Sequence, residues 1–343
     1  MKKPSTLLRS FSARLSTRLA PSPAVAPWPP VRSAYDRWLA AELDELRADP
    51  LAPSTSAAWL GRALGLAVAA QRRLVDASAS GTPTAAGIDR KTVDECVEDT
   101  AELLDACAGF RDRLDMLRGY ATSMRVALHW LEGHGGGEAA ARRAAAALAE
   151  CEAVERRCGA ELAKCGSNLR KLGERALLRR RQPAGGAGAH DEALSGARAL
   201  ALLAVGALGA GLAFRPRRAV SGVASHAGSG EAVAHWECAL QEVQRHVREE
   251  YERRRKEGVP CMAELDAAAA ASRAVRCAVA GGRRCPETVA DAARRRCDEL
   301  EDTVAALEEK VGELHGALIR VRMVLMERAQ RARGHELLRL PRI

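Results

Sequence analysis

Aromatic residues are scarce in this sequence: Phe, Trp and Tyr together make up 3% of the 343 residues. Strands favour aromatic and β-branched side chains, whereas this chain is rich in Ala, Leu, Arg and Glu, which favour helices. Hydrophobic residues make up 47% and charged residues 28%, a balance typical of globular rather than disordered chains. The composition therefore predicts an all-α protein, a bundle of long antiparallel helices.

The sequence also lacks the short motifs that carry common chemistry. No Gly-x-Gly-x-x-Gly follows a predicted strand, no glycine-rich stretch ends in Gly-Lys-Ser/Thr, and neither Cys-x-x-Cys nor His-Glu-x-x-His occurs. The eight histidines are scattered, and none shares a local motif with a nucleophile and an acid. We therefore predict a protein that is not an enzyme, with no catalytic residues, no cofactor and no metal.

Ten cysteines without a visible secretory signal favour a reducing compartment over a disulfide-bonded scaffold. Cys151, Cys158 and Cys165 recur at intervals of seven. Residues seven apart on a helix are separated by about 10 Å, too far to share a metal ion bound to sulfur at about 2.3 Å. We interpret them as small buried residues. Cys277 and Cys285 lie near one another but lack the second close pair of a zinc site.

Positive charges exceed negative charges by nine, and such an excess attracts acidic surfaces such as membranes or nucleic acids. Basic clusters occur at residues 179–181, 215–218 and 294–296. No aromatic platform, recognition helix or finger motif accompanies them, so we predict no binding to nucleic acid. Two of the clusters flank the central apolar stretch, where they suit lipid headgroups at least as well.

This central stretch runs without a charge from Ala199 to Phe214. As a helix it would be about 24 Å long, whereas a bilayer core needs about 30 Å, or about 20 residues. Its small residues allow another helix to approach closely, in a bilayer or in a soluble bundle. It is predicted to be a buried core helix or a membrane-associated helix. The candidate residues are Leu200, Leu203, Val205, Gly206, Leu208, Gly211, Leu212 and Phe214.

The remaining chain divides around this stretch. Residues 1–33 are rich in Ser and Pro and contain six basic residues, with no acid before Asp36, which indicates a transit segment or a disordered basic arm. Periodicity and loop composition predict the other parts. These are an N-terminal helical half at 34–182, a linker at 183–195, the apolar helix at 196–214, a basic and then Gly/Ser-rich loop at 215–231, and a C-terminal helical half at 232–334.

The strongest periodic signal lies near the C-terminus. Apolar residues alternate there at intervals of four and three: Leu300, Val304, Leu307, Val311, Leu314, Leu318, Val321 and Leu325. This spacing predicts a long bundle helix or one strand of a coiled coil. Packing within the chain is favoured because earlier helices offer matching stripes, and self-association through this helix is the alternative.

Acidic residues gather on the long helix expected from about residue 89 to residue 132. Most of them fall on the side away from Val93, Val97 and Leu104. Charge of one sign concentrated on one face steers encounter with a surface of the opposite sign. The candidate partner face is therefore Glu95, Glu98, Asp99, Glu102 and Asp105. An ordinary solvated helix face is the alternative.

The order of these segments resembles the plant BYPASS family. Residues 93–107, Val-Asp-Glu-Cys-Val-Glu-Asp-Thr-Ala-Glu-Leu-Leu-Asp-Ala-Cys, are similar to an acidic helix with a Leu-Leu-Asp-x-Cys core in that family. The pieces Ala-Trp-Leu at 58–60 and Val-Ala-Leu-His-Trp-Leu-Glu at 126–132 match its neighbouring segments. The resemblance covers roughly residues 34–333 and departs at Cys96 and Val97, where an aromatic residue or Leu is usual.

The resemblance implies a non-enzymatic plant regulator of root and shoot development. Members of the family restrain a root-derived mobile signal that otherwise arrests shoot growth. They are described as membrane-associated, or as chloroplastic on the strength of their N-termini. From another class, the alternative is a soluble, cytoplasmic helical scaffold that binds a protein partner such as a membrane-tethering complex. Burial of Ala199 to Phe214 by the other helices is the feature that distinguishes the two.

Overall fold

The computed structural model describes residues 33–48, 52–79, 90–132, 138–180, 189–215, 234–280 and 285–339. Within these ranges the chain forms eight α-helices and no strand, which confirms the predicted all-α bundle. The helices are α1 Ala34–Ala48, α2 Ala57–Ala79, α3 Arg90–Glu132, α4 Glu138–Arg180, α5 Ala189–Gly211, α6 His235–Glu257, α7 Ala263–Ala280 and α8 Glu287–Arg339.

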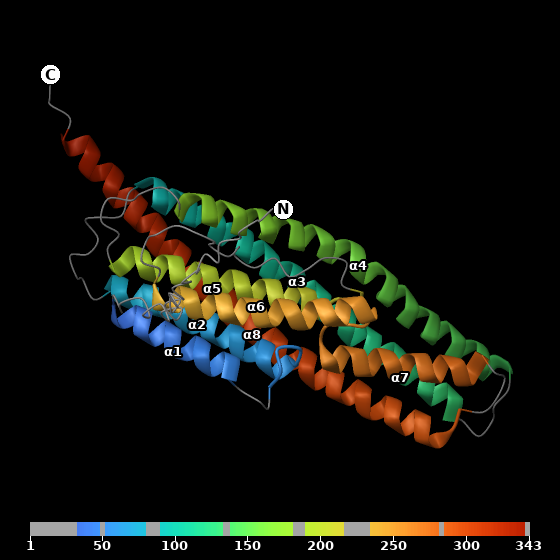
Figure 1. Cartoon of the computed structure of the whole chain (residues 1–343). Coiled ribbons are helices and arrows are strands. Elements are labelled where there is room, and N and C mark those ends of the chain that lie inside the picture. The colour runs from blue at the N-terminus through green and yellow to red at the C-terminus, as the bar shows by residue number, and fades with distance from the viewer. Residues whose placement is uncertain are drawn as a thin grey trace, which may run out of the picture.

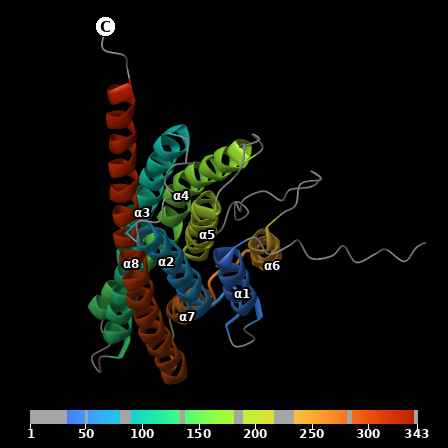
Figure 2. The ribbon, with the colours of Figure 1, turned by 90° about the vertical axis from the view of Figure 1, so that its left-hand side faces the viewer.

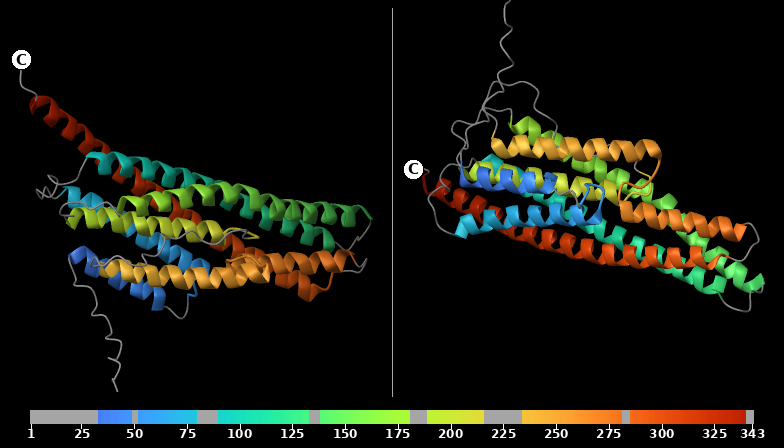
Figure 3. Two further views of the ribbon diagram at one scale, coloured as in Figure 1. Left: turned by 45° about the horizontal axis from the view of Figure 1, so that its top comes forward. Right: turned by 60° about the horizontal axis from the view of Figure 1, so that its bottom comes forward.

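Three long helices set the shape of the molecule. Helices α3 and α8 run side by side, and α4 follows the other side of α3 (Figures 1 and 2). Arg125 of α3 pairs with Glu301 of α8, and Arg322 of α8 donates to the Val97 carbonyl at 2.6 Å, so α3 and α8 are antiparallel. Helix α2 packs along α8, and α7 covers the N-terminal part of α8 (Figure 3).

The predicted stripe of α8 holds this arrangement together. All eight of its residues, from Leu300 to Leu325, are buried, with at most 4% of their surface exposed. The stripe therefore packs within the chain, as favoured from the sequence, because α2, α3 and α7 cover it. The stripe residues are therefore covered within one chain, and self-association through another side of this helix stays a prediction.

Carboxylates from distant helices cap two helix starts. Asp36 of α1 is fully buried and accepts a hydrogen bond from the Trp236 backbone amide of α6 at 2.7 Å. Glu264 of α7 accepts from the Ala57 amide at the start of α2, with both carboxylate oxygens at 3.1 Å. The first amides of a helix have no partner within that helix and favour negative charge. These contacts therefore fix where helices from opposite parts of the chain meet.

Three predicted boundaries need correction. Helix α5 begins at Ala189, so residues 189–195 of the predicted linker are helical, and it ends at Gly211 instead of residue 214. Helix α8 continues to Arg339 instead of ending at 334. The two helical halves pack on each other, because α1 contacts α6 and α3 contacts α8. The basic segment, except for Ser33, and residues 216–231 of the predicted loop lie outside the described residues.

Candidate functional site

The central apolar helix is enclosed by the bundle. Helix α5 packs against α1, α2, α3, α4 and α6. Seven of the eight candidate residues are buried, and only Gly206 is partly exposed. Gly211 brings α5 close to α2, since a Cβ there would lie 3.0 Å from a methyl carbon of Leu60. The stretch Glu192–Gly211 is long and apolar enough to cross a membrane, but 72% of its apolar 18-residue window is buried inside the protein.

Buried polar side chains from three helices hydrogen-bond to the backbone of α5 and of the turn that ends it. Gln71 of α2 donates to the Ala197 carbonyl at 3.1 Å, and Tyr251 of α6 donates to the Ala207 carbonyl at 3.5 Å. Arg113 of α3, itself buried, donates two hydrogen bonds to the Leu212 carbonyl at 3.1 and 3.3 Å. A cation is favoured at a helix C-terminus, where carbonyls lack partners within the helix. Helix α5 is thus held by specific contacts as well as by apolar packing.

A buried ion pair joins α5 to α3. One carboxylate oxygen of Asp99 lies 2.5 Å from Nη2 of Arg198, and Asp99 is only 2% exposed. Arg175 of α4 lies 3.7 Å from the other carboxylate oxygen and 2.5 Å from Glu102. Removing one partner from such a pair leaves a buried charge without compensation. We therefore assign these residues to holding three helices in position.

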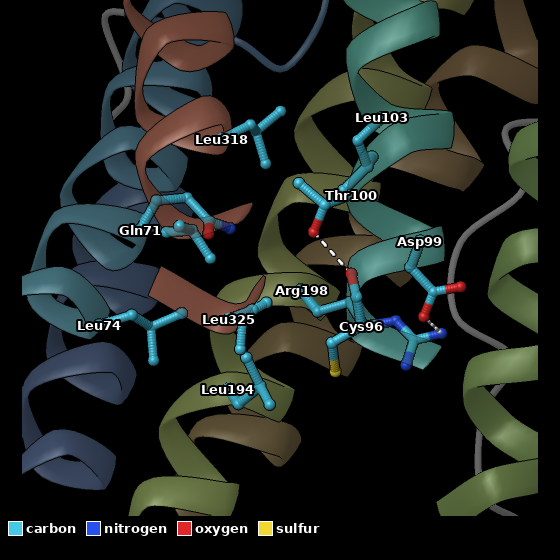
Figure 4. A pocket seen from close by; sticks show the side chains of 11 residues that line it. Gln71, Leu74, Cys96, Asp99, Thr100, Leu103, Leu194, Arg198, Leu318 and Leu325 are labelled. Carbon is cyan, nitrogen blue, oxygen red and sulfur yellow. Dashed lines mark hydrogen bonds and ion pairs between the residues drawn. The ribbon is translucent and has the colours of Figure 1, made fainter. Parts of the chain in front are cut away.

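A small cavity lies beside this ion pair (Figure 4). Gln71, Thr100 and Arg198 contribute polar groups to it, and Thr100 donates a hydrogen bond to the Cys96 carbonyl at 2.6 Å. The open volume is about 20 Å³, room for a single water. Ligand pockets measure about 300–1,000 Å³, so this cavity is too small for a metabolite. No group of three or more metal-ligating side chains occurs among the described residues.

The candidate partner face is only partly exposed. Glu98 and Asp105 are exposed, whereas Glu95 is partly buried and Glu102 pairs with Arg175. Placing Asp99 on this face was wrong, because its carboxylate is buried against Arg198. On a helix, Asp99 shares a side with the residues three before and four after it, Cys96 and Leu103. Both are apolar and buried, a signal that was present in the sequence.

Sequence reasoning missed two features of the neighbouring surface. Asp112 is exposed and continues the spacing of seven from Glu98 and Asp105, and we call these three residues the acidic row. On α8, Ile319, Met323 and Met326 are 40%, 56% and 44% exposed, and we call them the apolar strip. Their spacing of four and three repeats on a second side of α8 the pattern that was noticed only for the buried stripe. Their common side of one helix makes the apolar strip a candidate interaction surface.

The acidic row and the apolar strip lie at the same level of the bundle. Val97 is level with Arg322, and Arg111 lies 3.7 Å from where a Cβ of Gly312 would be. Residues 97–111 of α3 therefore run beside residues 312–322 of α8. At 100° per residue, the partly exposed Val97, Ala101 and Leu104 fall between the acidic row and α8. This surface carries acidic, apolar and basic side chains, because Arg111 lies over Gly312, Arg320 lies over Gly316 and Arg322 reaches the Val97 carbonyl.

Comparison with known protein families, with curated proteins and with solved structures finds no match for this chain. The architecture is therefore assigned from the structure itself: an all-α bundle built around one enclosed apolar helix. The resemblance to the BYPASS family gains no support from these comparisons.

Proposed function

We propose that this protein is a non-enzymatic helical scaffold that binds a protein partner through the surface formed by α3 and α8. The enclosure of α5 carries this proposal, because it is the feature that distinguishes a soluble scaffold from a membrane-inserted protein. Three buried side chains donate hydrogen bonds to backbone carbonyls of α5 and of its terminal turn. A helix inserted in lipid would have to leave these contacts, and the unpaired polar groups would cost several kcal/mol.

The exposed surface supplies the partner site. Glu98 and Asp105 form no ion pair with the described residues, and the apolar strip beside them exposes large side chains. Methionine side chains adapt to differently shaped partners, and acidic side chains speed the approach of a basic one. In this proposal, membrane contact is peripheral and does not involve insertion of α5.

A biological role as a plant developmental regulator that restrains a root-derived mobile signal is the second part of the proposal. It rests on the residues that resemble the BYPASS family. The stretch 93–107 that carries the resemblance belongs to α3 and includes Glu98, Asp105 and the buried Asp99. A partner that binds this surface would contact some of the same residues that give the resemblance.

Charge reversal on the acidic row tests the proposal. The variant Glu98→Lys/Asp105→Lys is expected to keep its melting temperature, because exposed charges contribute little to stability, and to lose co-purifying partners and rescue of a mutant plant. The matched control is Asp302→Lys/Glu309→Lys. It reverses two exposed acidic residues that are also seven apart but lie on α8, outside the acidic row. Normal partner recovery and normal rescue by the first variant would place the partner site elsewhere.

A further inference from the structure

The contact between α3 and α8 repeats every seven residues. The repeat takes residues 132, 125, 118 and 111 on α3 and residues 294, 301, 308 and 315 on α8, which gives four levels along the antiparallel pair. At the first three levels, an arginine of one helix pairs with a carboxylate of the other: Arg294 with Glu132, Arg125 with Glu301 and Asp298, and Arg118 with Glu308. Such pairs at heptad spacing fix how two helices pack.

The fourth level has the arginine but no carboxylate. Seven residues after Glu308 the chain has His315, and Arg111 lies over Gly312 instead, with its Nη2 atom 3.7 Å from where a Cβ would be. Arg111 forms no ion pair with the residues that the structure describes. Burial and the nearby charge of Arg111 lower the pKa of His315 below its ordinary value of 6.5. The imidazole is therefore neutral at pH 7 and leaves the charge of Arg111 uncompensated.

A second arginine lies beside the first. The Nη1 atom of Arg320 is 3.7 Å from where a Cβ of Gly316 would be, and Arg320 has no ion pair within the described chain either. Cβ positions four residues apart on a helix are separated by about 5–6 Å, so the two guanidinium groups occupy neighbouring turns of α8. Besides these groups, no other helix of the described chain comes within 4 Å of either position. Two like charges thus meet at a place that stays open to an anion.

The balance of charge indicates which anion fits. Arg125 pairs with two carboxylates, and Arg118 pairs with Asp115 at 2.5 Å as well as with α8. The fourth level reverses this balance, because it has two guanidinium groups and no carboxylate. A phosphate monoester carries a charge of about −1.5 to −2 at pH 7, and guanidinium groups bind phosphate oxygens through paired N–H donors. One phosphate group therefore supplies the charge that is missing, whereas one carboxylate supplies about half.

The acidic row favours a phosphorylated protein segment over a lipid. Asp105 and Asp112 are exposed on α3, about 100–120° around the helix from Arg111. An anionic bilayer would press its whole surface charge against these carboxylates. A segment that combines one phosphate with basic residues can place each charge opposite its complement. The apolar strip next to Arg320 offers contacts to apolar side chains of the same segment.

We propose that the guanidinium groups of Arg111 and Arg320 bind one phosphorylated side chain of a protein partner. Basic residues beside the phosphorylated one then face the acidic row. The inference rests on the proposed function for the existence of a partner and adds the chemistry by which the partner is recognised. Phosphorylation of the partner thereby controls its binding.

Calorimetric titration of the purified full-length protein tests the site. The probes are the peptide acetyl-Arg-Arg-Leu-Ser-Leu-amide and the same peptide phosphorylated on serine. The wild type is expected to bind the phosphorylated form at least tenfold more tightly, and Arg111→Gln/Arg320→Gln is expected to lose this preference. The matched control is Arg273→Gln/Arg295→Gln, which removes two exposed arginines on α7 and α8 and should keep the preference. Circular dichroism should be unchanged for both variants.

Supplying the missing carboxylate makes the test specific. His315→Glu places an acid at the position that the seven-residue repeat predicts. It should pair with Arg111, reduce the preference for the phosphorylated peptide at least tenfold and leave the melting temperature no lower. The control His315→Gln, which adds no charge, should keep the preference. Equal preference in these two variants would overturn the assignment of the site to the fourth level.

Two further results would overturn the proposal. One is equal binding of the two peptides by the wild type, or a preference that survives Arg111→Gln/Arg320→Gln. The other is equally tight binding, through the same arginines, to phosphatidylcholine vesicles that contain phosphatidylinositol phosphate, which would assign the site to a lipid headgroup. The ratio between two synthetic peptides does not depend on partner recovery. A failure of the proposed function, seen as normal partner recovery by Glu98→Lys/Asp105→Lys, is therefore a separate result.

Discussion

Helices α5 and α8 bury apolar residues in different ways. From Ala199 to Val205 every residue of α5 is buried, on all sides of the helix. On α8 the buried residues form one stripe, while Ile319, Met323 and Met326 lie in solvent on another side. A helix that is apolar all round is one that other helices enclose, whereas a striped helix contacts its neighbours on one side only. The striped helix therefore has surface left for a partner, and the enclosed one has little.

Charges introduced into the two helices should give the largest difference. Leu203→Arg/Leu208→Arg places two charges at fully buried positions of α5. Each unpaired buried charge costs at least several kcal/mol, against a total stability of about 5–15 kcal/mol, so we expect the protein not to fold. Ile319→Arg/Met323→Arg on α8 should melt near the wild-type temperature. Thermal melting followed by circular dichroism checks this. Equal melting temperatures for the two variants would contradict the difference in burial between α5 and this side of α8.

The ion pair between α5 and α3 should give the next largest effect. Arg198→Met removes the arginine closest to the buried Asp99 carboxylate and leaves Arg175 at 3.7 Å from it. Breaking a buried ion pair costs about 3–5 kcal/mol, and the remaining arginine should hold the loss to the lower part of that range. Asp99→Asn/Arg198→Gln removes both charges and should cost less than the single change. Urea unfolding gives both values, and a more stable single variant would show that the pair does not hold the helices.

The two sides of α8 can be compared by truncation. Leu314→Ala removes a fully buried side chain from the stripe, and large-to-small changes of this kind cost about 2–5 kcal/mol. Met323→Ala removes an exposed side chain and should stay within about 0.5 kcal/mol of the wild type. Urea unfolding measures both losses. Similar losses for the two variants would mean that the apolar strip is covered in solution.

The reactivity of buried and exposed cysteine thiols should give the smallest and most local difference. Burial raises the pKa of Cys297 on α8 to about 11, and the pKa values of Cys151 and Cys261 to about 12, from an ordinary value of 9.0. Cys277 on α7 is exposed. At neutral pH, a thiol reagent followed by peptide mass spectrometry should modify Cys277 well before the three buried thiols. Early modification of Cys297 would show that α8 is not packed as described.

The same three thiols predict how the free energy of unfolding changes with pH. In the unfolded chain they lose their protons near pH 9, whereas in the folded protein they keep them until about pH 11–12. Above pH 9 the unfolded state therefore binds fewer protons than the folded state, and stability falls as pH rises. Their full contribution is present below pH 9 and is lost as pH rises through the folded-state pKa values. Urea unfolding at pH 8 and pH 10.5 should show the loss, and serine at the three positions should reduce it.

The sequence predicted the fold class and the buried stripe of α8 well, because both follow from local spacing and composition. It did not decide whether α5 is a core helix or a membrane-associated helix, because burial of α5 depends on helices from distant parts of the chain. The position of Asp99 was mispredicted for a related reason. Its partner Arg198 is about a hundred residues away in sequence, and only the packing of α5 on α3 brings the two together. The apolar strip was visible as spacing, but its exposure was not.

The central proposal is that α5 is the core helix of the bundle and does not insert in a membrane. Fractionation of the tagged full-length protein from cells, with an alkaline wash of the membrane pellet and no detergent, tests it most directly. The account predicts that the wild type is in the supernatant, or released to it by the wash, and that Leu203→Arg/Leu208→Arg is found as unfolded, aggregated protein. Wild type that stays in the washed pellet, together with release of the folded double variant into the supernatant, would contradict it.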